Sequence, residues 1–337
     1  MSVLALDIGG ANLKIADGGG FASSRSFALW RHPERLGSEL SDLIAIAPPA
    51  RRIVATMTGE LADCFATKAD GVRAIVEALL TAAGDSEVRI YLTDGSLVST
   101  DEAIRRPLEA AASNWHALAN FTARFIDPNA SLLVDVGSTT CDIIPLVDGQ
   151  PQALGRTDPE RLASGELVNT GVERSPVCAL VASLAWRGTE CRVAQELFAT
   201  TYDAYLTTGD LPEEPENRHT ADGRPATRDA AHDRLARCIC ADRSMFTAAD
   251  AVAAAKRIAA AQQSLLIQAI RQVVGRQRQR PAMVVISGQG EFLARRAVNE
   301  ALGECTIVSL AERLGPAIAR VGPAHALAVL AHERRTR

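Results

Sequence analysis

Short apolar runs alternate with longer stretches of helical periodicity along most of the chain, a pattern typical of α/β proteins. In its first part the pattern predicts strands at Val3–Ile8, Leu13–Ala16, Phe21–Trp30, Arg52–Thr56 and Val88–Leu92, and helices at Leu61–Ala83 and Asp101–Phe125. We assign these elements to a first lobe, residues 1–128.

A second lobe, residues 129–319, is predicted to begin at the turn-forming Asp127-Pro128-Asn129. Its predicted elements are the strands Leu132–Val136, Asp142–Val147 and Met283–Ser287 and the long helix Thr247–Val274. The last predicted helix is Gly322–His332, and we expect residues 320–337 to return to the first lobe.

Residues 207–229 differ from the rest of the chain because they are rich in Pro, Gly and charge and poor in apolar side chains. This composition predicts an exposed insertion. It favours a lid over a cleft and a mobile loop without function about equally.

Two segments share one pattern, a strand, Asp-x-Gly, a short turn and a second strand. They are "LALDIGGANLKIAD" near the N-terminus and "LLVDVGSTTCDIIPLVDG" at the start of the second lobe. The match predicts a structural duplication. If the lobes pack about a pseudo-twofold axis, Asp7 and Asp135 face one cleft.

The residue types in these loops indicate phosphate binding. Glycines allow tight turns and let backbone N–H groups approach phosphate oxygens, while amide and hydroxyl side chains add donors. Two carboxylates facing a phosphate require a divalent cation, and Mg²⁺ is the expected ion. The predicted phosphate-binding residues are Gly9, Gly10, Asn12, Lys14, Gly137, Ser138, Thr139 and Thr140, with Asp7 and Asp135 as metal ligands.

A third glycine turn, Gly288-Gln289-Gly290, follows the apolar run "MVVIS". Such a turn can place a nucleotide against glycine backbone at a helix N-terminus, or it can be a plain strand-to-helix connection. The sequence alone leaves both interpretations open.

Composition and charge exclude several classes of function. The chain has 337 residues, a formal net charge of -4 and only 4% aromatic residues, which argues against binding nucleic acid. No signal-like or membrane-spanning apolar segment is evident, so we expect a cytoplasmic protein without a membrane partner. The seven cysteines are scattered, which predicts buried free thiols rather than a zinc site. The oligomeric state, including a homo-oligomer, stays open.

"LALDIGGANLK", "LLVDVGSTTCDII" and "VVISGQG" resemble the phosphate-1, phosphate-2 and adenosine motifs of the actin-like ATPase and sugar kinase (ASKHA) superfamily. The resemblance implies two ribonuclease-H-like lobes, with mixed sheets flanked by helices, around a central cleft.

Further segments resemble the hydantoinase/oxoprolinase-related branch found beside tetrahydromethanopterin-linked one-carbon genes. They are "ATMTGELADCFATKADGV", "SNWHALA", "SGELVNTGVERSPV" and "DRLARCICADR". The resemblance implies a methanofuran-biosynthesis synthase that joins an aminomethylfuran diphosphate to the phenol of a tyramine derivative and releases diphosphate. The chain has Asn169 and Ser175 where the branch pattern has Tyr and Thr, which puts substrate fit at Asn169 in doubt.

That chemistry requires a group that accepts the phenol proton, and the candidates are Glu60, Asp63 and Asp142. Glu60 and Asp63 are expected in the first turn of a helix, where the helix dipole alone also favours acidic residues. Arg174 is expected either to bind a substrate carboxylate, such as a glutamyl tail, or to form an ion pair between the lobes.

Two alternatives use the same loops. The first is an ATP-dependent enzyme, either a kinase or an amidohydrolase related to oxoprolinase. The second is a non-enzymatic, actin-like nucleotide switch. The chain shows no separate client domain in its sequence pattern, which ranks the switch last.

Overall fold

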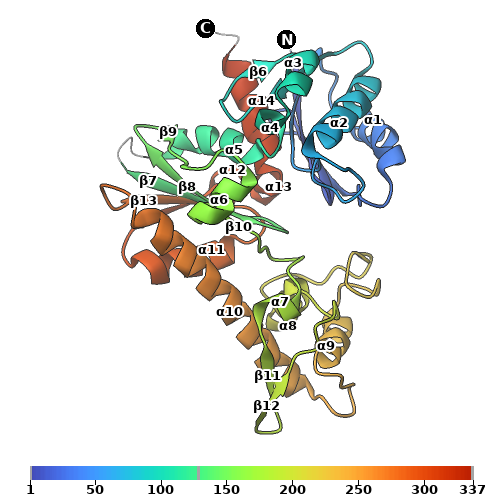
Figure 1. Cartoon of the computed structure of the whole chain (residues 1–337), viewed down its shortest axis with the longest axis vertical. Helices are drawn as coiled ribbons and strands as arrows, with labels where there is room; N and C mark the ends of the chain where they lie inside the picture. Colours follow the sequence, from blue (N-terminus) through green and yellow to red (C-terminus); the bar gives the residue numbers. More distant parts are fainter. Residues whose placement is uncertain (1, 127–129, 335–337) are drawn as a thin grey trace.

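Two mixed β-sheets with the same strand order form the centre of the computed structural model, which describes residues 2–126 and 130–334 (Figure 1). The first sheet has the order β3 (Ala22–Ser26), β2 (Asn12–Ala16), β1 (Val3–Ile8), β4 (Arg52–Met57), β5 (Glu87–Tyr91) and β6 (Leu97–Val98). The second has the order β10 (Leu167–Val168), β8 (Cys141–Val147), β7 (Ser131–Val136), β13 (Met283–Ser287) and β14 (Thr306–Ser309), with β9 (Gln150–Pro151) paired to β8.

The direction of pairing also matches between the sheets. In each, the strand that precedes the Asp-x-Gly turn pairs antiparallel with the strand after it and parallel with a later strand. The predicted α/β class with two related sheets is therefore confirmed, and the repeated motif is a repeat of topology.

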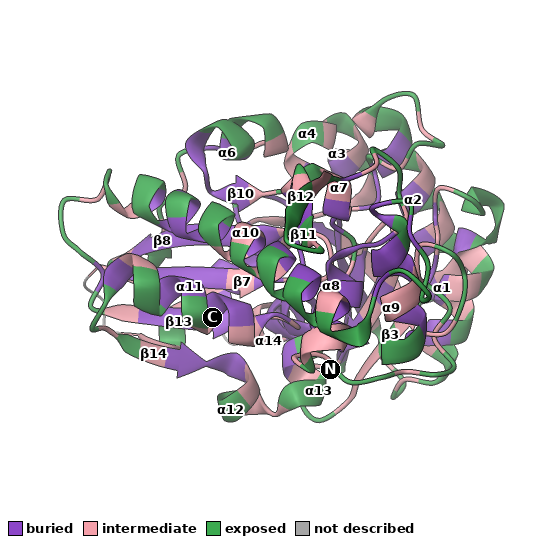
Figure 2. Ribbon diagram, turned by 90° about the horizontal axis from the view of Figure 1, so that it is seen from below, coloured by how far each residue is buried: buried purple, intermediate pink, exposed green. Residues whose placement is uncertain are grey.

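Helices cover both faces of each sheet, so that the strands are buried and the outer helix faces are exposed (Figure 2). The helices that precede β7 in the chain are α1 (Leu36–Ala45), α2 (Lys68–Ala83), α3 (Thr100–Arg105), α4 (Pro107–Ala110) and α5 (Asn114–Thr122), with short 3₁₀ helices at Pro33–Arg35 and Ala123–Phe125. The helices that follow β8 in the chain are α6 (Asp158–Ser164), α10 (Ala248–Val274), α11 (Glu291–Leu302), α12 (Leu310–Leu314), α13 (Pro316–Arg320) and α14 (Gly322–Glu333), and α14 returns to the first sheet.

Side-chain alternation along the strands assigns each helix to a face. Leu4 and Leu6 of β1 pack with α1 and α2, while Val3 and Ala5 pack with α14. In the second sheet, β7 and β13 pack against α10 and α11 on one face and against α5 and α12 on the other. Helix α5 thus packs on one face of the second sheet, and the C-terminal α14 packs on one face of the first.

A third hydrophobic cluster lies beyond the second sheet, at the far end of α10 (Figure 1). Its elements are α7 (Val177–Leu180), β11 (Ser183–Trp186), β12 (Thr189–Arg192), α8 (Thr201–Thr208) and α9 (Arg228–Arg237). Their apolar side chains pack around Phe246 and Ile258. The sequence pattern did not predict this separate core, because its elements are short.

Several predicted boundaries differ from the structure for local reasons. The helix predicted from Leu61 begins only at Lys68, where the Thr67 side chain accepts a hydrogen bond from the Asp70 N–H as an N-cap. The stretch predicted as one helix from Asp101 to Phe125 is broken, since Pro107 cannot continue α3. The helix α1 was not predicted, and the turn predicted at Asp127-Pro128-Asn129 lies outside the described residues.

No helix within the described ranges is long and apolar enough to cross a membrane. The seven cysteines carry free thiols, but only Cys141 and Cys238 are buried, so the expectation of buried thiols is wrong for the other five.

Candidate active site at the two hairpin turns

The first hairpin places Asp7 at the buried end of β1. Asp7 lies opposite Lys14 of β2, whose Nζ is 3.7 Å from Asp7 Oδ2, and it accepts a 3.3 Å hydrogen bond from Thr56 Oγ1. The Gly9 N–H donates to the Asn12 carbonyl at 3.0 Å and closes the turn. Burial raises the pKa of Asp7, and Lys14 opposes this shift.

The second hairpin repeats this geometry with one change of charge. The Gly137 N–H donates to the Thr140 carbonyl at 2.9 Å, and Asp135 lies opposite Asp142 instead of a lysine. Burial raises the pKa of Asp135 to about 7, and Asp142 and Asp7 add to the shift. Because Asp7 acts on Asp135 from the other hairpin, the two carboxylates share one electrostatic environment.

Asp142 forms a buried ion pair with Arg161. Arg161 Nη2 donates to Asp142 Oδ1 at 2.5 Å, and the guanidinium lies over the Trp115 ring at 4.3 Å. Removing either partner of such a pair leaves an uncompensated buried charge. The arrangement fits a positioning role for Asp142 beneath the second hairpin better than that of a free base.

A polar cavity of about 220 Å³ lies where the three predicted motifs meet. Its wall includes Asn12 and Lys14 of the first hairpin, Ser138 of the second and Gln289 of the glycine turn. Four of the residues that the sequence singled out thus line one cavity, whereas Gly9, Gly10, Gly137, Thr139 and Thr140 are absent from its wall. Thr139 lies next to Ser138, with its hydroxyl 3.4 Å away, and Gly10 lies beside Gly59 on the other side of the turn.

A second, more apolar cavity of about 420 Å³ shares part of this wall. Its apolar side chains include Tyr202, Leu211, Pro212 and Phe292. The side chains that line both cavities are Glu173, Glu214, Gln289 and Arg320. A ligand with a phosphate end and an apolar ring has room to lie across both.

The glycine turn after β13 packs directly against the end of β7. Gly288 has a φ of +90°, and a Cβ there would lie 2.3 Å from the Val136 carbonyl oxygen and 2.8 Å from Asp135 Oδ1. The Gly290 N–H donates to the same carbonyl at 2.9 Å. The close packing requires glycine at both positions. Gln289 lines both cavities, and Gly288 lines the apolar one.

Residues 170–175 support the second hairpin from behind. The N–H groups of Val172, Glu173 and Arg174 donate to the carbonyls of Gly137 and Ser138 at 3.0 Å. A network of buried hydrogen bonds holds this loop. The segment contains one of the sequence motifs, but the network was not predicted from the sequence. Its bonds are Thr170 Oγ1 to Ser175 Oγ at 2.7 Å, Gln262 Nε2 to Thr170 Oγ1 at 2.8 Å and Tyr205 OH to Gln262 Oε1 at 2.6 Å.

The two departures from the branch pattern fall in different places. Ser175 supplies the hydroxyl of that buried network, whereas Asn169 is exposed. Arg174 lies over the Trp30 ring at 4.7 Å, so it bridges the lobes by a cation–π contact. An ion pair between the lobes is made instead by Lys68 Nζ and Asp158 Oδ2, at 2.6 Å.

Replacing Gly171 by Ala is expected to displace the second hairpin. An added Cβ would lie 2.4 Å from the Ser138 carbonyl carbon and the Thr139 nitrogen, and overpacking of this kind typically costs about 1–3 kcal/mol. Urea denaturation should show a lower free energy of unfolding, with weaker diphosphate binding. Gly20→Ala is the control, because nothing lies within 4 Å of its added Cβ. Equal stability of the two variants would contradict the prediction.

The expectation that Glu60 and Asp63 share the first turn of a helix is wrong. Both precede Lys68, where α2 begins, in an irregular segment. Glu60 is buried, with Oε1 3.6 Å from Lys68 Nζ and Oε2 without a hydrogen-bond partner, whereas Asp63 is exposed. Burial raises the pKa of Glu60 to about 7, and Lys68 opposes the shift.

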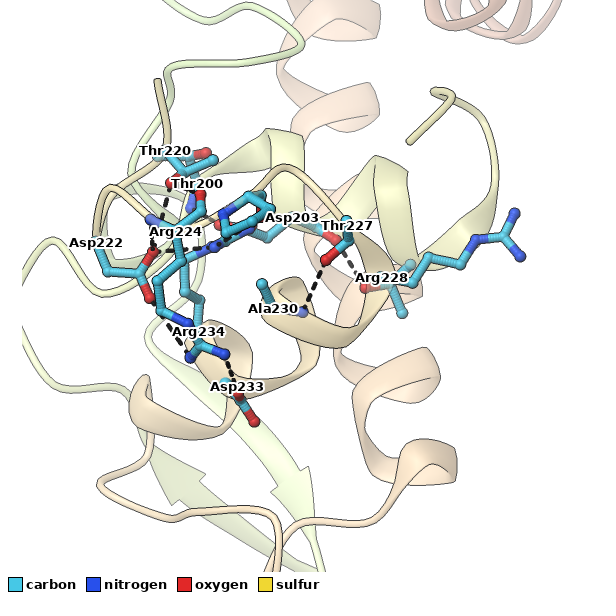
Figure 3. A network of polar contacts seen from close by, with 12 residues as sticks. Thr200, Asp203, Thr220, Asp222, Arg224, Thr227, Arg228, Ala230, Asp233 and Arg234 are labelled. Atoms are coloured by element: carbon cyan, nitrogen blue, oxygen red, sulfur yellow. Dashed lines mark hydrogen bonds and ion pairs between the residues drawn. The ribbon is translucent and has the colours of Figure 1, made fainter. Parts of the chain in front are cut away.

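The insertion 207–229 is fixed at its base by a buried arginine (Figure 3). Arg234 of α9 donates from Nε to Asp203 Oδ1 at 2.7 Å and from Nη1 to Asp222 Oδ1 at 3.0 Å. Asp203 also caps α8 by accepting from the Thr200 N–H at 2.9 Å. Because the insertion supplies Leu211 and three further residues to the cavity walls, this anchor sets the shape of the cleft.

Two carboxylates, one from each hairpin, are the candidate ligands of a metal ion. In the ranges that the structure describes, no three His, Cys, Asp or Glu side chains are grouped to hold a metal. Asp7 and Asp135 are absent from the walls of both cavities, but Asp7 lies 3.7 Å from Lys14 Nζ, and Lys14 lines the polar cavity. Mg²⁺ is usually held by one or two carboxylates plus substrate phosphates, so these two residues are the ones that would hold it.

Two sheets of one topology, each with an Asp-x-Gly hairpin at a common cleft, define the actin-like ATPase fold. A solved acetone carboxylase structure, nucleotide-free, shares it with a TM-score of 0.56 at 12% sequence identity, over 97% of this chain and 70% of that one. The chain belongs to the hydantoinase/oxoprolinase family, whose family model matches residues 51–333.

Two curated relatives are synthases with the same named product. One, from Methanocaldococcus jannaschii, is 34% identical over 97% of this chain and 97% of its own length. The other, from Methanococcus vannielii, is 32% identical over 63% of this chain and 95% of its own. Their product is a furan-2-yl methanamine that carries, through a phenoxymethyl link, a γ-L-glutamylaminoethyl group.

Proposed function

We propose that this protein is a cytoplasmic transferase of methanofuran-type one-carbon cofactor biosynthesis. It joins an aminomethylfuran diphosphate to the phenol of γ-glutamyltyramine and releases diphosphate. The supporting observation is the polar cavity formed by both hairpins, joined to an apolar cavity that can take a ring. The product named for the relatives contains the aryl ether that this reaction would form.

The reaction breaks the bond between the furan methylene carbon and the diphosphate oxygen, and diphosphate leaves with the electron pair. The phenol oxygen forms the new bond to that carbon, and its proton passes to a base. A furan-methyl cation is resonance-stabilised, so the protein must chiefly stabilise the leaving group, exclude water and orient the phenol. Lys14, Asn12 and Ser138 are placed to bind diphosphate, and Mg²⁺, when bound, would neutralise part of its charge.

Among the three proposed proton acceptors, Glu60 has the environment that best supports the role, although its side chain is absent from both cavity walls. It follows Gly59, which packs against the Gly9 carbonyl in the first hairpin. Its Oε2 has no partner, and a pKa of about 7 suits a base that works near neutral pH. Asp63 is exposed, and Asp142 is paired with Arg161.

Use of ATP is the second candidate function, because the apolar cavity lies beside Gly288 and Gln289 of the adenosine-like turn. A thermal-shift titration with Mg²⁺ and either diphosphate or ATP separates the two. The transferase should be stabilised by diphosphate, by about 2.7 kcal/mol at 100 times the Kd, with no preference for adenine. Clear preference for ATP would favour a kinase or an amidohydrolase.

A further inference from the structure

The wall shared by the two cavities carries two negative charges, which is unexpected for a site that binds diphosphate. Of its four side chains, Glu173 and Glu214 are carboxylates and Arg320 is a cation. A carboxylate that faces a bound diphosphate repels it, so each acidic side chain here requires a partner.

Glu214 has its partners within the protein. Its Oε2 accepts from Tyr202 OH at 3.1 Å and from Asn217 Nδ2 at 2.7 Å, and its Oε1 lies 3.8 Å from Arg320 Nη2. Glu214 therefore joins the insertion to α13 and uses the arginine of the shared wall.

Glu173 lacks such a counter-ion. Within residues 2–126 and 130–334, no lysine, arginine or histidine forms an ion pair with its half-buried carboxylate. Its backbone is held firmly, because its N–H donates to the Ser138 carbonyl at 3.0 Å and the preceding loop packs on the second hairpin. Burial raises the pKa of Glu173 and the charge of Glu214 adds to the shift, while the charges of Arg320 and Lys14 and a hydrogen bond with the neutral Gln289 side chain lower it.

We propose that Glu173 binds the primary ammonium group of the donor substrate, so that the ligand of the joined cavities is an amine-bearing diphosphate ester. The proposal rests on the proposed function, since the relatives' named product is a methanamine. A ligand whose diphosphate lies against Lys14 and whose ring enters the apolar cavity would lie beside Glu173, which lines both cavities. ATP carries no ammonium group and would leave Glu173 without a counter-ion.

The test compares two donors, the aminomethylfuran diphosphate and its analogue with methyl in place of aminomethyl. Ether formation and calorimetric binding are measured for wild type, Glu173→Gln and the control Glu312→Gln, whose carboxylate is exposed outside the cavities. Wild type and the control should prefer the amine by about 10- to 100-fold in kcat/KM, the range for a hydrogen bond between charged groups. Glu173→Gln should lose this preference and process the methyl analogue as well as wild type does.

An unchanged preference for the amine in Glu173→Gln would overturn the proposal, as would equal wild-type binding of the two diphosphates. Failure of the proposed function appears differently, as no ether from either donor with wild type. Calorimetry of the two diphosphates still decides in that case whether Glu173 recognises the amine.

Discussion

Asp135→Asn is expected to lower turnover at least tenfold while the protein stays folded. Asp135 is the carboxylate of the second hairpin that lies opposite Asp142 and is within electrostatic reach of Asp7. In the proposed mechanism, its charge would help to hold Mg²⁺ beside the leaving diphosphate. Loss of one preorganised electrostatic group typically costs about 10²–10³ in rate. Steady-state diphosphate release measures the effect.

The same substitution should raise stability in the absence of ligands, and the sign follows from the pKa. The folded pKa of Asp135 is raised from 3.8 to about 7, so the unfolded state ionises first and stability falls as pH rises between these values. Asn abolishes that loss. The variant should melt above wild type at pH 8, and the difference should shrink toward pH 4.

Asp148→Asn is the matched control, because Asp148 is an exposed turn residue at the opposite end of the same hairpin. It should leave both turnover and melting unchanged. Wild-type turnover in Asp135→Asn would show that the assigned cleft is wrong.

Arg234→Met is expected to reduce the free energy of unfolding by about 3–5 kcal/mol, the usual cost of breaking a buried ion pair from one side. Arg234 is fully buried, and without it Asp203 loses its main counter-ion and Asp222 loses a link to α9. Because the insertion is attached through these contacts, limited proteolysis should cut residues 207–229 faster. Urea denaturation and a protease time course measure the two effects.

Arg237→Met tests whether burial decides this result. Arg237 lies one turn further along α9, is largely exposed and contacts the same Asp222 at 3.5 Å, and an exposed ion pair is worth about 0–1 kcal/mol. If both variants lose equally little stability, the insertion is not held by Arg234.

The sequence was sufficient to predict the parts of the fold that depend on local pattern. Strands β1, β7 and β13 begin or end within a residue of their predicted bounds, and the Asp-x-Gly turns that join β1 to β2 and β7 to β8 are equivalent. These strands are short, mainly apolar and followed by glycine, which makes their pattern distinct. The start of α2 was misjudged because Leu61 and Phe65 continue an apolar period through a segment that Thr67 separates from the helix.

The candidate site was predictable only where its residues lie in sequence motifs. Asn12, Lys14, Ser138 and Gln289 were singled out and do line one cavity. Glu173 was not singled out, because its importance comes from where the loop after β10 folds back on the second hairpin. Contacts between segments far apart in sequence leave no periodic signal.

The contrast between Glu60 and Asp63 shows the same limit. Both are acidic residues in one short segment, yet one is buried beside Lys68 and the other is exposed. No spacing rule distinguishes them, since the chain between Gly59 and Thr67 is irregular. Gly71 of α2 packs against the Glu60 backbone, a contact that no spacing rule predicts.

The central claim is tested most directly by incubating the protein with the aminomethylfuran diphosphate, γ-glutamyltyramine and Mg²⁺, without ATP. Ether product is measured by mass spectrometry, and released diphosphate is measured in the same samples. If the protein is the proposed transferase, ether and diphosphate should form in equal amounts, with no increase when ATP is added. Product that forms only with ATP, or diphosphate release without ether, would contradict it.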